Sequence, residues 1–258
     1  MKMPNWNPIQ YEKFLRDRTQ PAIDLANRLT ALSPRSILDV GCGTGNSTQV
    51  LQDKFPNARI VGADYSDEML ARAREKHPEI AFIHADASGD LHEISETYDL
   101  VFSNACIQWL PNHRTLLPKL ATLLNAHGTL AVQIPMQREH PVHQLLNQLV
   151  RTEKWANRLA PRTYNNLTTA EYFDVLSELS DDFAMWETYY IHRMPDVDSI
   201  IEWYKGTGLR PYLEQLDESG KEDFLRDVAA ELAKQYPKQE NGEILFRFPR
   251  LFFTMTKK

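Results

Sequence analysis

The sequence predicts an α/β protein built on a doubly wound, mostly parallel sheet of seven strands. From about residue 35 to residue 135, five short apolar runs alternate with segments of helical spacing, which is the pattern of consecutive βαβ units. Two further strand-like runs follow at 183–192 and 244–255. Four of the early runs end in a polar or acidic residue, and ligands of open α/β sheets bind outside such strand ends.

The first of these units carries the most informative motif of the chain. Residues 37–46 read Ile-Leu-Asp-Val-Gly-Cys-Gly-Thr-Gly-Asn, an apolar run that ends in an acid and is followed by three glycines at alternate positions. This order predicts a buried strand, a tight turn and a helix that starts near Asn46. Glycines let a ligand approach the backbone closely, and the free amides of a helix start face it.

The spacing of the glycines argues against a dinucleotide. A Gly-x-Gly-x-x-Gly fingerprint that begins at Gly41 requires its third glycine at position 46, which is Asn46. Asp39 stands two residues before the first glycine. Its carboxylate would repel a pyrophosphate but would attract an α-ammonium group by roughly 1–4 kcal/mol. A purely structural glycine turn is the alternative interpretation.

The following units add further candidate side chains. The second run, 58–63, ends at Asp64, whose carboxylate is placed to accept hydrogen bonds from ribose hydroxyls. Met69, on the helix that follows, is expected to cover one face of an adenine ring. The third run ends at Asp86, and the fourth is followed by Asn104. Taken singly, each acid is more simply a turn or N-cap residue; their order behind the glycine loop favours a nucleoside site.

Composition limits the classes of function. With 258 residues, 42% hydrophobic and 25% charged, the chain is expected to form a single domain over 1–258. A net charge of −6 argues against nucleic-acid binding. No apolar run reaches the ~20 residues that span a bilayer, and the first residues lack a secretory signal. Two cysteines provide no disulfide framework, so we expect a cytoplasmic protein.

Two helical segments outside the alternating region are expected to cover the strand ends. Residues 1–32 predict an N-terminal helical lid, which Pro21 divides into two helices, although plain helix packing explains the same pattern. Residues 195–240 form a helical block that is too large for a connecting loop, and we expect it to be an inserted cover over the substrate.

Several stretches resemble known families. The Asp-Val-Gly-Cys-Gly-Thr-Gly run resembles the first motif of class I methyltransferases, which use S-adenosyl-L-methionine. Nearly the whole chain is similar to the trans-aconitate methyltransferase family, through Trp6-Asn-Pro8, Gln108-Trp-Leu-Pro111, Gly206-Thr-Gly-Leu-Arg-Pro211 and Phe248-Pro-Arg-Leu-Phe252. The resemblance implies a Rossmann-like sheet of order 3-2-1-4-5-7-6 with one antiparallel strand near its edge. It also implies methyl transfer to a carboxylate of trans-aconitate or a related small tricarboxylate, giving a monomethyl ester and S-adenosylhomocysteine.

The resemblance, together with the motifs, assigns two sets of residues. Expected to bind the cofactor S-adenosyl-L-methionine are Asp39, Gly41, Gly43, Gly45, Asn46, Asp64, Tyr65, Met69, Asp86, Ala87, Asn104 and Ala105. Expected at the substrate are Arg210 and Arg250, which lie in family-specific segments, then Tyr190 and Trp109 as pocket lining, with Arg18 and Arg247 as weaker candidates.

No catalytic base and no metal site are expected. A carboxylate with a pKa near 4 is already ionised at pH 7, and a sulfonium methyl group is electrophilic without a metal. His140 and His143 lie three residues apart, but no acid or cysteine stands at ligand spacing, so a solvated helix face is the preferred interpretation. We expect no nucleic-acid, membrane or obligate protein partner. Two alternatives stay open: another acceptor (a different acid, a carrier-bound acyl group, or a carbon or nitrogen nucleophile), or a nucleoside-binding module without turnover.

Overall fold

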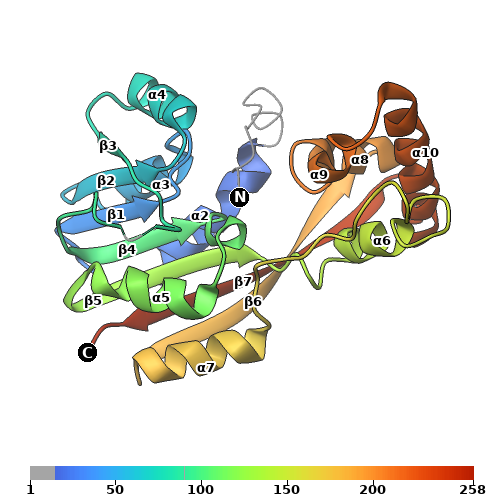
Figure 1. Ribbon diagram of the computed structural model, residues 1–258. Helices are drawn as coiled ribbons and strands as arrows, with labels where there is room; N and C mark the ends of the chain where they lie inside the picture. Colours follow the sequence, from blue (N-terminus) through green and yellow to red (C-terminus); the bar gives the residue numbers. More distant parts are fainter. Residues whose placement is uncertain (1–14, 90) are drawn as a thin grey trace. The chain divides into compact units, whose positions relative to one another are not determined.

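The computed structural model describes residues 15–89 and 91–258, with side chains from residue 19 onward. Within these residues seven strands form one sheet in the order β3-β2-β1-β4-β5-β7-β6 (Figure 1). The strands are β1 (Ser36–Val40), β2 (Arg59–Asp64), β3 (Ala81–His84), β4 (Tyr98–Asn104), β5 (Leu124–Pro135), β6 (Phe183–Met194) and β7 (Ile244–Thr256). The neighbouring strands β3, β2, β1, β4 and β5 pair in parallel, and β7 runs antiparallel to β5. The predicted fold class and strand order are confirmed.

Helices connect these strands. They are α2 (Leu15–Arg28), α3 (Asn46–Lys54), α4 (Asp67–Lys76), the 3-10 helix η1 (Ile107–Trp109), α5 (His113–Thr122), α6 (Pro141–Leu149), α7 (Thr169–Leu179), α8 (Val197–Lys205), α9 (Arg210–Leu213) and α10 (Glu218–Gln235). The predicted break at Pro21 is wrong, because α2 continues through it. Ala22 and Leu25 are fully buried on this helix, and their packing offsets the roughly 3 kcal/mol that an interior proline costs.

The chain divides into two compact units. The first, here called the sheet unit, contains residues 16–135, 165–188 and 250–258. The second, here called the helical unit, contains residues 136–164 and 189–249 together with Leu15. Strands β6 and β7 contribute residues to both units.

The sheet unit has its core around the central strands. Ile37 and Leu38 of β1 are fully buried, and so are Leu100, Val101 and Phe102 of β4. Strands of a parallel sheet that are covered on both faces read as continuous apolar runs rather than as alternating ones, which is why the sequence pattern located them. Helix α3 packs on β2 and helix α4 on β3 (Figure 1).

The helical unit has a separate hydrophobic core. Helices α6, α8 and α10 contribute to one buried cluster that includes Leu146, Ile200 and Phe224. The predicted helical block at 195–240 contains α8, α9 and α10 and lies between β6 and β7 in the chain. The helical unit is larger than the predicted block, because residues 136–164, which include α6, also belong to the unit. Its role as a substrate cover stays a prediction.

His140 and His143 lie in this core, so the predicted solvated helix face is wrong. Their side chains are 1% and 4% exposed. The His140 ring lies 4.7 Å from the Phe248 ring, between centroids, and its Nδ1 accepts the backbone N–H of Val142 as the N-cap of α6. His143 Nδ1 lies 3.2 Å from the Tyr164 hydroxyl, and burial lowers the pKa of His143 well below its usual value. The sequence pattern could not show that the start of α6 packs on aromatic residues of β7.

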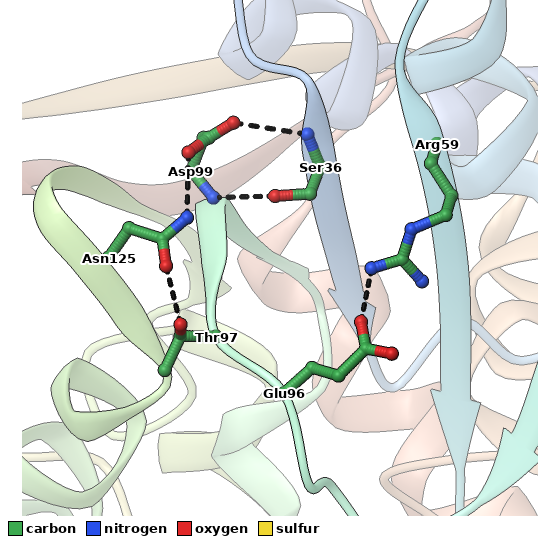
Figure 2. Close-up of polar contacts among 6 residues, drawn as sticks. All are labelled: Ser36, Arg59, Glu96, Thr97, Asp99 and Asn125. Carbon is green, nitrogen blue, oxygen red and sulfur yellow. Dashed lines mark hydrogen bonds and ion pairs between the residues drawn. The ribbon is translucent and has the colours of Figure 1, made fainter.

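Polar side chains join the strands at the ends opposite to the candidate site. Asp99, at the start of β4, accepts the backbone N–H of Ser36 through Oδ2 at 3.2 Å and the Asn125 amide through Oδ1 at 2.7 Å (Figure 2). The same Oδ2 accepts the backbone N–H of Arg35 at 2.8 Å. The Ser36 hydroxyl accepts the Asp99 N–H. Further contacts there join Thr97 with Asn125 and Arg59 with Glu96. The hydrogen bond from Asn125, with those from the two backbone amides, holds the pKa of Asp99 below its usual value.

Replacing Asp99 by alanine is therefore expected to change stability and not ligand binding. The variant leaves two backbone amides and one side-chain amide without their acceptor, and we expect a loss of about 1–3 kcal/mol in the free energy of unfolding at pH 7. Because the folded-state pKa of Asp99 is lowered, its contribution is present above pH 3.8 and disappears as the pH falls through the folded value. Denaturant titrations at pH 7 and pH 3 test this, with cofactor affinity as the control.

Candidate functional site

The glycine loop lies at the carboxyl ends of the parallel strands. In the sheet register Asp39 of β1 stands beside Gly62 of β2 on one side and beside Phe102 of β4 on the other. The chain that follows each of these three strands therefore emerges at the same edge of the sheet, where open α/β folds bind their ligands. All of these residues belong to the sheet unit.

Two glycines of the loop have different surroundings. Gly41 has φ +75°, and its N–H donates to Ala63 O at 2.8 Å. A Cβ atom at Gly41 would lie 2.2 Å from Cys106 Sγ and 2.3 Å from Cys106 Cβ. Gly43 has φ +56°, and a Cβ there would meet no atom of the described residues within 4 Å. Gly41 is thus packed against the chain after β4, whereas the backbone at Gly43 borders open space.

Asp39 lies under the loop and not on the surface. Its carboxylate is fully buried, and Oδ2 accepts the hydroxyl groups of Ser47 and Thr48, both at 2.7 Å. Oδ1 has no hydrogen-bond partner in the described part of the chain. Burial raises the pKa of Asp39 to about 6, although the two hydroxyl groups act against this shift. The interaction energy expected at a surface-like dielectric does not apply to this position, because β1 is a central strand of the sheet.

Asp64 ties the end of β2 to the glycine loop. Its Oδ2 accepts the backbone N–H of Gly43 at 2.9 Å, and its Oδ1 accepts that of Ser66 at 2.9 Å. Burial raises the pKa of Asp64 above its ordinary value. Tyr65 is 44% exposed, while Met69 is buried on α4. The side chain of Asp64 therefore fixes the shape of the loop, and its proposed contact with a ribose stays a prediction.

The two remaining pairs of cofactor candidates differ in character. Asp86 Oδ1 accepts the backbone N–H and the hydroxyl of Ser88, at 2.8 and 2.6 Å, which is the local turn that such an acid commonly forms. Ala87, next to it, is 8% exposed. Asn104 Oδ1 is buried without a partner among the described residues, and Ala105 has φ +51°. Asn104 thus presents a polar atom without a protein partner at the end of β4.

Gly45 and Asn46 mark the start of α3. Gly45 is the N-cap residue, and the Asn46 amide donates to the Thr44 hydroxyl at 3.2 Å. The side chains of Ser47 and Thr48, which hold Asp39, come from the first turn of the same helix. These two hydroxyl groups were not among the predicted site residues, although they directly follow the glycine loop in the sequence.

The substrate candidates of the sheet unit are Arg250, Trp109 and Arg18, and Arg250 lies at the end of β5. Arg250 pairs in register with Pro135 and is 4% exposed, and its guanidinium donates to Gln133 Oε1 at 3.3 Å. Trp109 is half-buried in η1. Arg18 lies on α2, but its side chain is outside the described residues. A buried arginine on a rigid strand has the fixed orientation that recognition of a carboxylate requires.

The substrate candidates of the helical unit are Arg210, Tyr190 and Arg247. Arg210 begins α9, and its Nε donates to Glu214 Oε1 at 2.6 Å. The Tyr190 ring stacks on His192 with centroids 6.4 Å apart, and the exposed Arg247 lies over the Tyr189 ring at 4.7 Å. Arg210 already forms an ion pair with a carboxylate, which makes it a weaker clamp than the sequence suggested. The i,i+4 spacing of Arg210 and Glu214 in the sequence could have indicated this ion pair.

The end of the sheet fits an S-adenosyl-L-methionine-type ligand better than a diphosphate. Asp39 Oδ1 and Asn104 Oδ1 are acceptor atoms without partners in the described chain, and Asp64 adds a second carboxylate. The open side of Gly43 leaves room for close approach. These groups favour a ligand with an ammonium group and hydroxyl donors. Among the described residues no set of three or more histidine, cysteine or acidic side chains is arranged to hold a metal ion.

Comparison with known proteins agrees with this geometry. Residues 37–128 match the family model described as a methyltransferase domain. The YcgJ protein of Bacillus subtilis has the same fold, with a TM-score of 0.60 and 16% identity over 93% of this chain and 99% of that one. The plantazolicin methyltransferase BamL, solved in complex with a triazolic desmethylPZN analog and SAH, has a TM-score of 0.53 and 16% identity over 96% of this chain and 86% of that one. The solved structures show the fold, and the family model places a methyltransferase domain at residues 37–128.

The relatives narrow the class further. A trans-aconitate 2-methyltransferase of Escherichia coli O7:K1 is 42% identical over 251 residues, which cover 97% of each chain. The chain belongs to the trans-aconitate 2-methyltransferase family. None of the helices in the described residues is both long and apolar enough for a membrane span.

Proposed function

We propose that this protein transfers the methyl group of S-adenosyl-L-methionine to one carboxylate of trans-aconitate, or of a closely related small tricarboxylate. The products are a monomethyl ester and S-adenosylhomocysteine. The observation that carries the proposal is the match to a trans-aconitate 2-methyltransferase over 97% of both chains. It is supported by Asp39 Oδ1 and Asn104 Oδ1, at the strand ends beside the glycine loop, which have no partner among the described residues and suit an ammonium group.

The sheet unit would hold the cofactor, which supplies an electrophilic methyl group on a sulfonium centre. Asp39 would face the α-ammonium group through Oδ1, because Oδ2 is already occupied by two hydroxyl donors. Asp64 would accept the ribose hydroxyls with its remaining lone pairs while it keeps the Gly43 amide. The open backbone at Gly43 would border the amino-acid part of the ligand.

The acceptor needs orientation and not activation. Its carboxyl groups are ionised at pH 7, so no residue has to remove a proton. A carboxylate oxygen attacks the methyl carbon as the carbon–sulfur bond breaks, and the bonding pair stays on sulfur. Holding the two groups in line lowers the barrier by up to ~7–11 kcal/mol in well-oriented systems.

Arginine side chains are expected to bind the carboxylates that do not react. The reacting carboxylate and the sulfonium group lose their charges in the transition state, so a cation on the attacking oxygen would slow the step. A guanidinium that grips a spectator carboxylate fixes orientation without this penalty. Arg250 is the stronger candidate because it is buried and bonded to a neutral amide, whereas Arg210 is paired with Glu214.

An assay with methyl-labelled cofactor and a panel of organic acids tests the proposal. We expect label on trans-aconitate, and little label on mono- and dicarboxylates of similar size. Label on a different acid, on a carrier-bound acyl group or on a nitrogen nucleophile would identify that compound as the acceptor in place of trans-aconitate. Cofactor binding without transfer to any acid would favour a nucleoside-binding module.

We also propose a cytoplasmic location. The two cysteines, Cys42 and Cys106, are free thiols, which supports a reducing compartment.

A further inference from the structure

A basic pocket lies within the helical unit, apart from every residue assigned above. It has a volume of about 570 Å³, and its wall includes three arginines, Arg138, Arg151 and Arg162. Among the described residues, no acidic side chain contributes to the wall. Within residues 15–89 and 91–258, Arg138 and Arg151 form no ion pair with a carboxylate. Three cations around one cavity repel one another, so an anion that binds between them is stabilised by all three.

One wall of the pocket is a single face of α6. Gln144, Asn147 and Gln148 follow the i, i+3, i+4 spacing that places side chains on one side of a helix, and Arg151 stands in the turn just after the helix ends at Leu149. The opposite face, with Leu146, is buried in the core of the unit. Because the opposite face is packed in this core, the helix that carries the amide side chains has a fixed position.

The other wall is the segment that carries Arg162 and Tyr164, which is tied to α6. The Asn147 side chain accepts the backbone N–H of Arg162 at 2.9 Å and donates to its carbonyl at 3.2 Å. The same Asn147 oxygen accepts the Tyr212 hydroxyl at 3.0 Å. The guanidinium of Arg162 lies over the Tyr164 ring at 5.6 Å. These contacts fix the distance between the two walls.

The pocket suits an anion with several carboxylates better than a phosphate. Phosphate sites commonly use the free amides of a helix N-terminus, but the start of α6 is capped by His140 and the pocket lies along the side of the helix. Arginine forks from separate chain segments match planar carboxylates that point in different directions. The volume exceeds what one phosphate needs.

We propose that this pocket binds a small di- or tricarboxylate anion, held by Arg138 and Arg151 with the amide side chains of α6. The proposal concerns binding and does not depend on methyl transfer.

Isothermal titration of the whole protein with trans-aconitate and with citrate, in the absence of cofactor, tests the proposal. The test variant is R138Q/R151Q, which changes two exposed side chains and so leaves the fold intact. The matched control is R193Q/R226Q, which removes the same charge from exposed positions of the same unit. We expect one binding event to weaken at least about tenfold in the test variant and to persist in the control.

Three results would overturn the proposal: no binding to the wild-type protein, equal weakening in both double variants, or displacement of citrate by an equal concentration of inorganic phosphate. Loss of this binding event in R138Q/R151Q supports the proposal whether the KM for the methyl acceptor rises or stays unchanged. If the wild type transfers no methyl group but still binds citrate through Arg138 and Arg151, the proposed function fails and this inference stands.

Discussion

Gly41→Ala is expected to abolish the native loop. The new Cβ would lie 2.2 Å from Cys106 Sγ and 2.3 Å from Cys106 Cβ, and rotation of the thiol cannot relieve the second contact. The backbone at φ +75° adds about 1 kcal/mol of strain for a residue with a side chain. Together with overpacking, we expect a loss of about 3 kcal/mol or more in the free energy of unfolding. Denaturant titration measures it.

Two companion variants make this test specific. Cys106→Gly removes both clashing atoms, so the double variant with Gly41→Ala should recover most of the lost stability. Gly43→Ala places its Cβ in open space and should cost only about 1 kcal/mol of stability, but it should weaken cofactor binding because the methyl group enters the ligand's side of the loop. Equal stability losses at positions 41 and 43 would contradict the packing of Gly41 on Cys106.

Asp39→Asn is expected to stabilise the protein above pH 6 while weakening cofactor binding. Burial raises the pKa of Asp39 to about 6 from 3.8. A raised folded-state pKa means that the contribution of Asp39 is fully present below pH 3.8 and is lost as the pH rises through about 6. A neutral amide avoids this loss. We therefore expect the variant to be about 1–3 kcal/mol more stable than the wild type at pH 8 and nearly equal to it at pH 4.

The same variant should bind S-adenosyl-L-methionine at least about tenfold more weakly, which is ~1.4 kcal/mol. The amide lacks the negative charge that we propose faces the ammonium group. Two measurements test this variant. One is the difference in the free energy of unfolding between wild type and variant across pH 4–8, and the other is the dissociation constant of each for the cofactor at pH 8. An unchanged dissociation constant would remove Asp39 from the cofactor site, even if the stability result held.

The fold could be predicted because its signals are local. Each buried parallel strand is a short apolar run, and the glycine loop marks the first βα turn, so the α/β class followed from the chain itself. The strand order and the antiparallel strand were implied by the family resemblance. Pro21 was misjudged because its effect on α2 is decided by the burial of Ala22 and Leu25, which depends on tertiary packing.

The positions of the candidate site residues at the strand ends could be predicted from the sequence, but their hydrogen bonds and packing contacts could not. Asp39 and Asp64 lie at the expected strand ends, yet no spacing rule shows that Ser47 and Thr48 occupy one oxygen of Asp39. The contact of Gly41 with Cys106 joins positions 65 residues apart. His140 and His143 were placed on a solvated face because helical spacing does not reveal what packs against that face.

The hydrogen bond from the Gly43 amide to Asp64 has a thermodynamic consequence. The loop already has a defined conformation in the free protein, so little backbone entropy is left to lose there when the nucleoside arrives. The heat-capacity change of association should then follow the apolar area of adenine that is buried and contain no contribution from loop ordering.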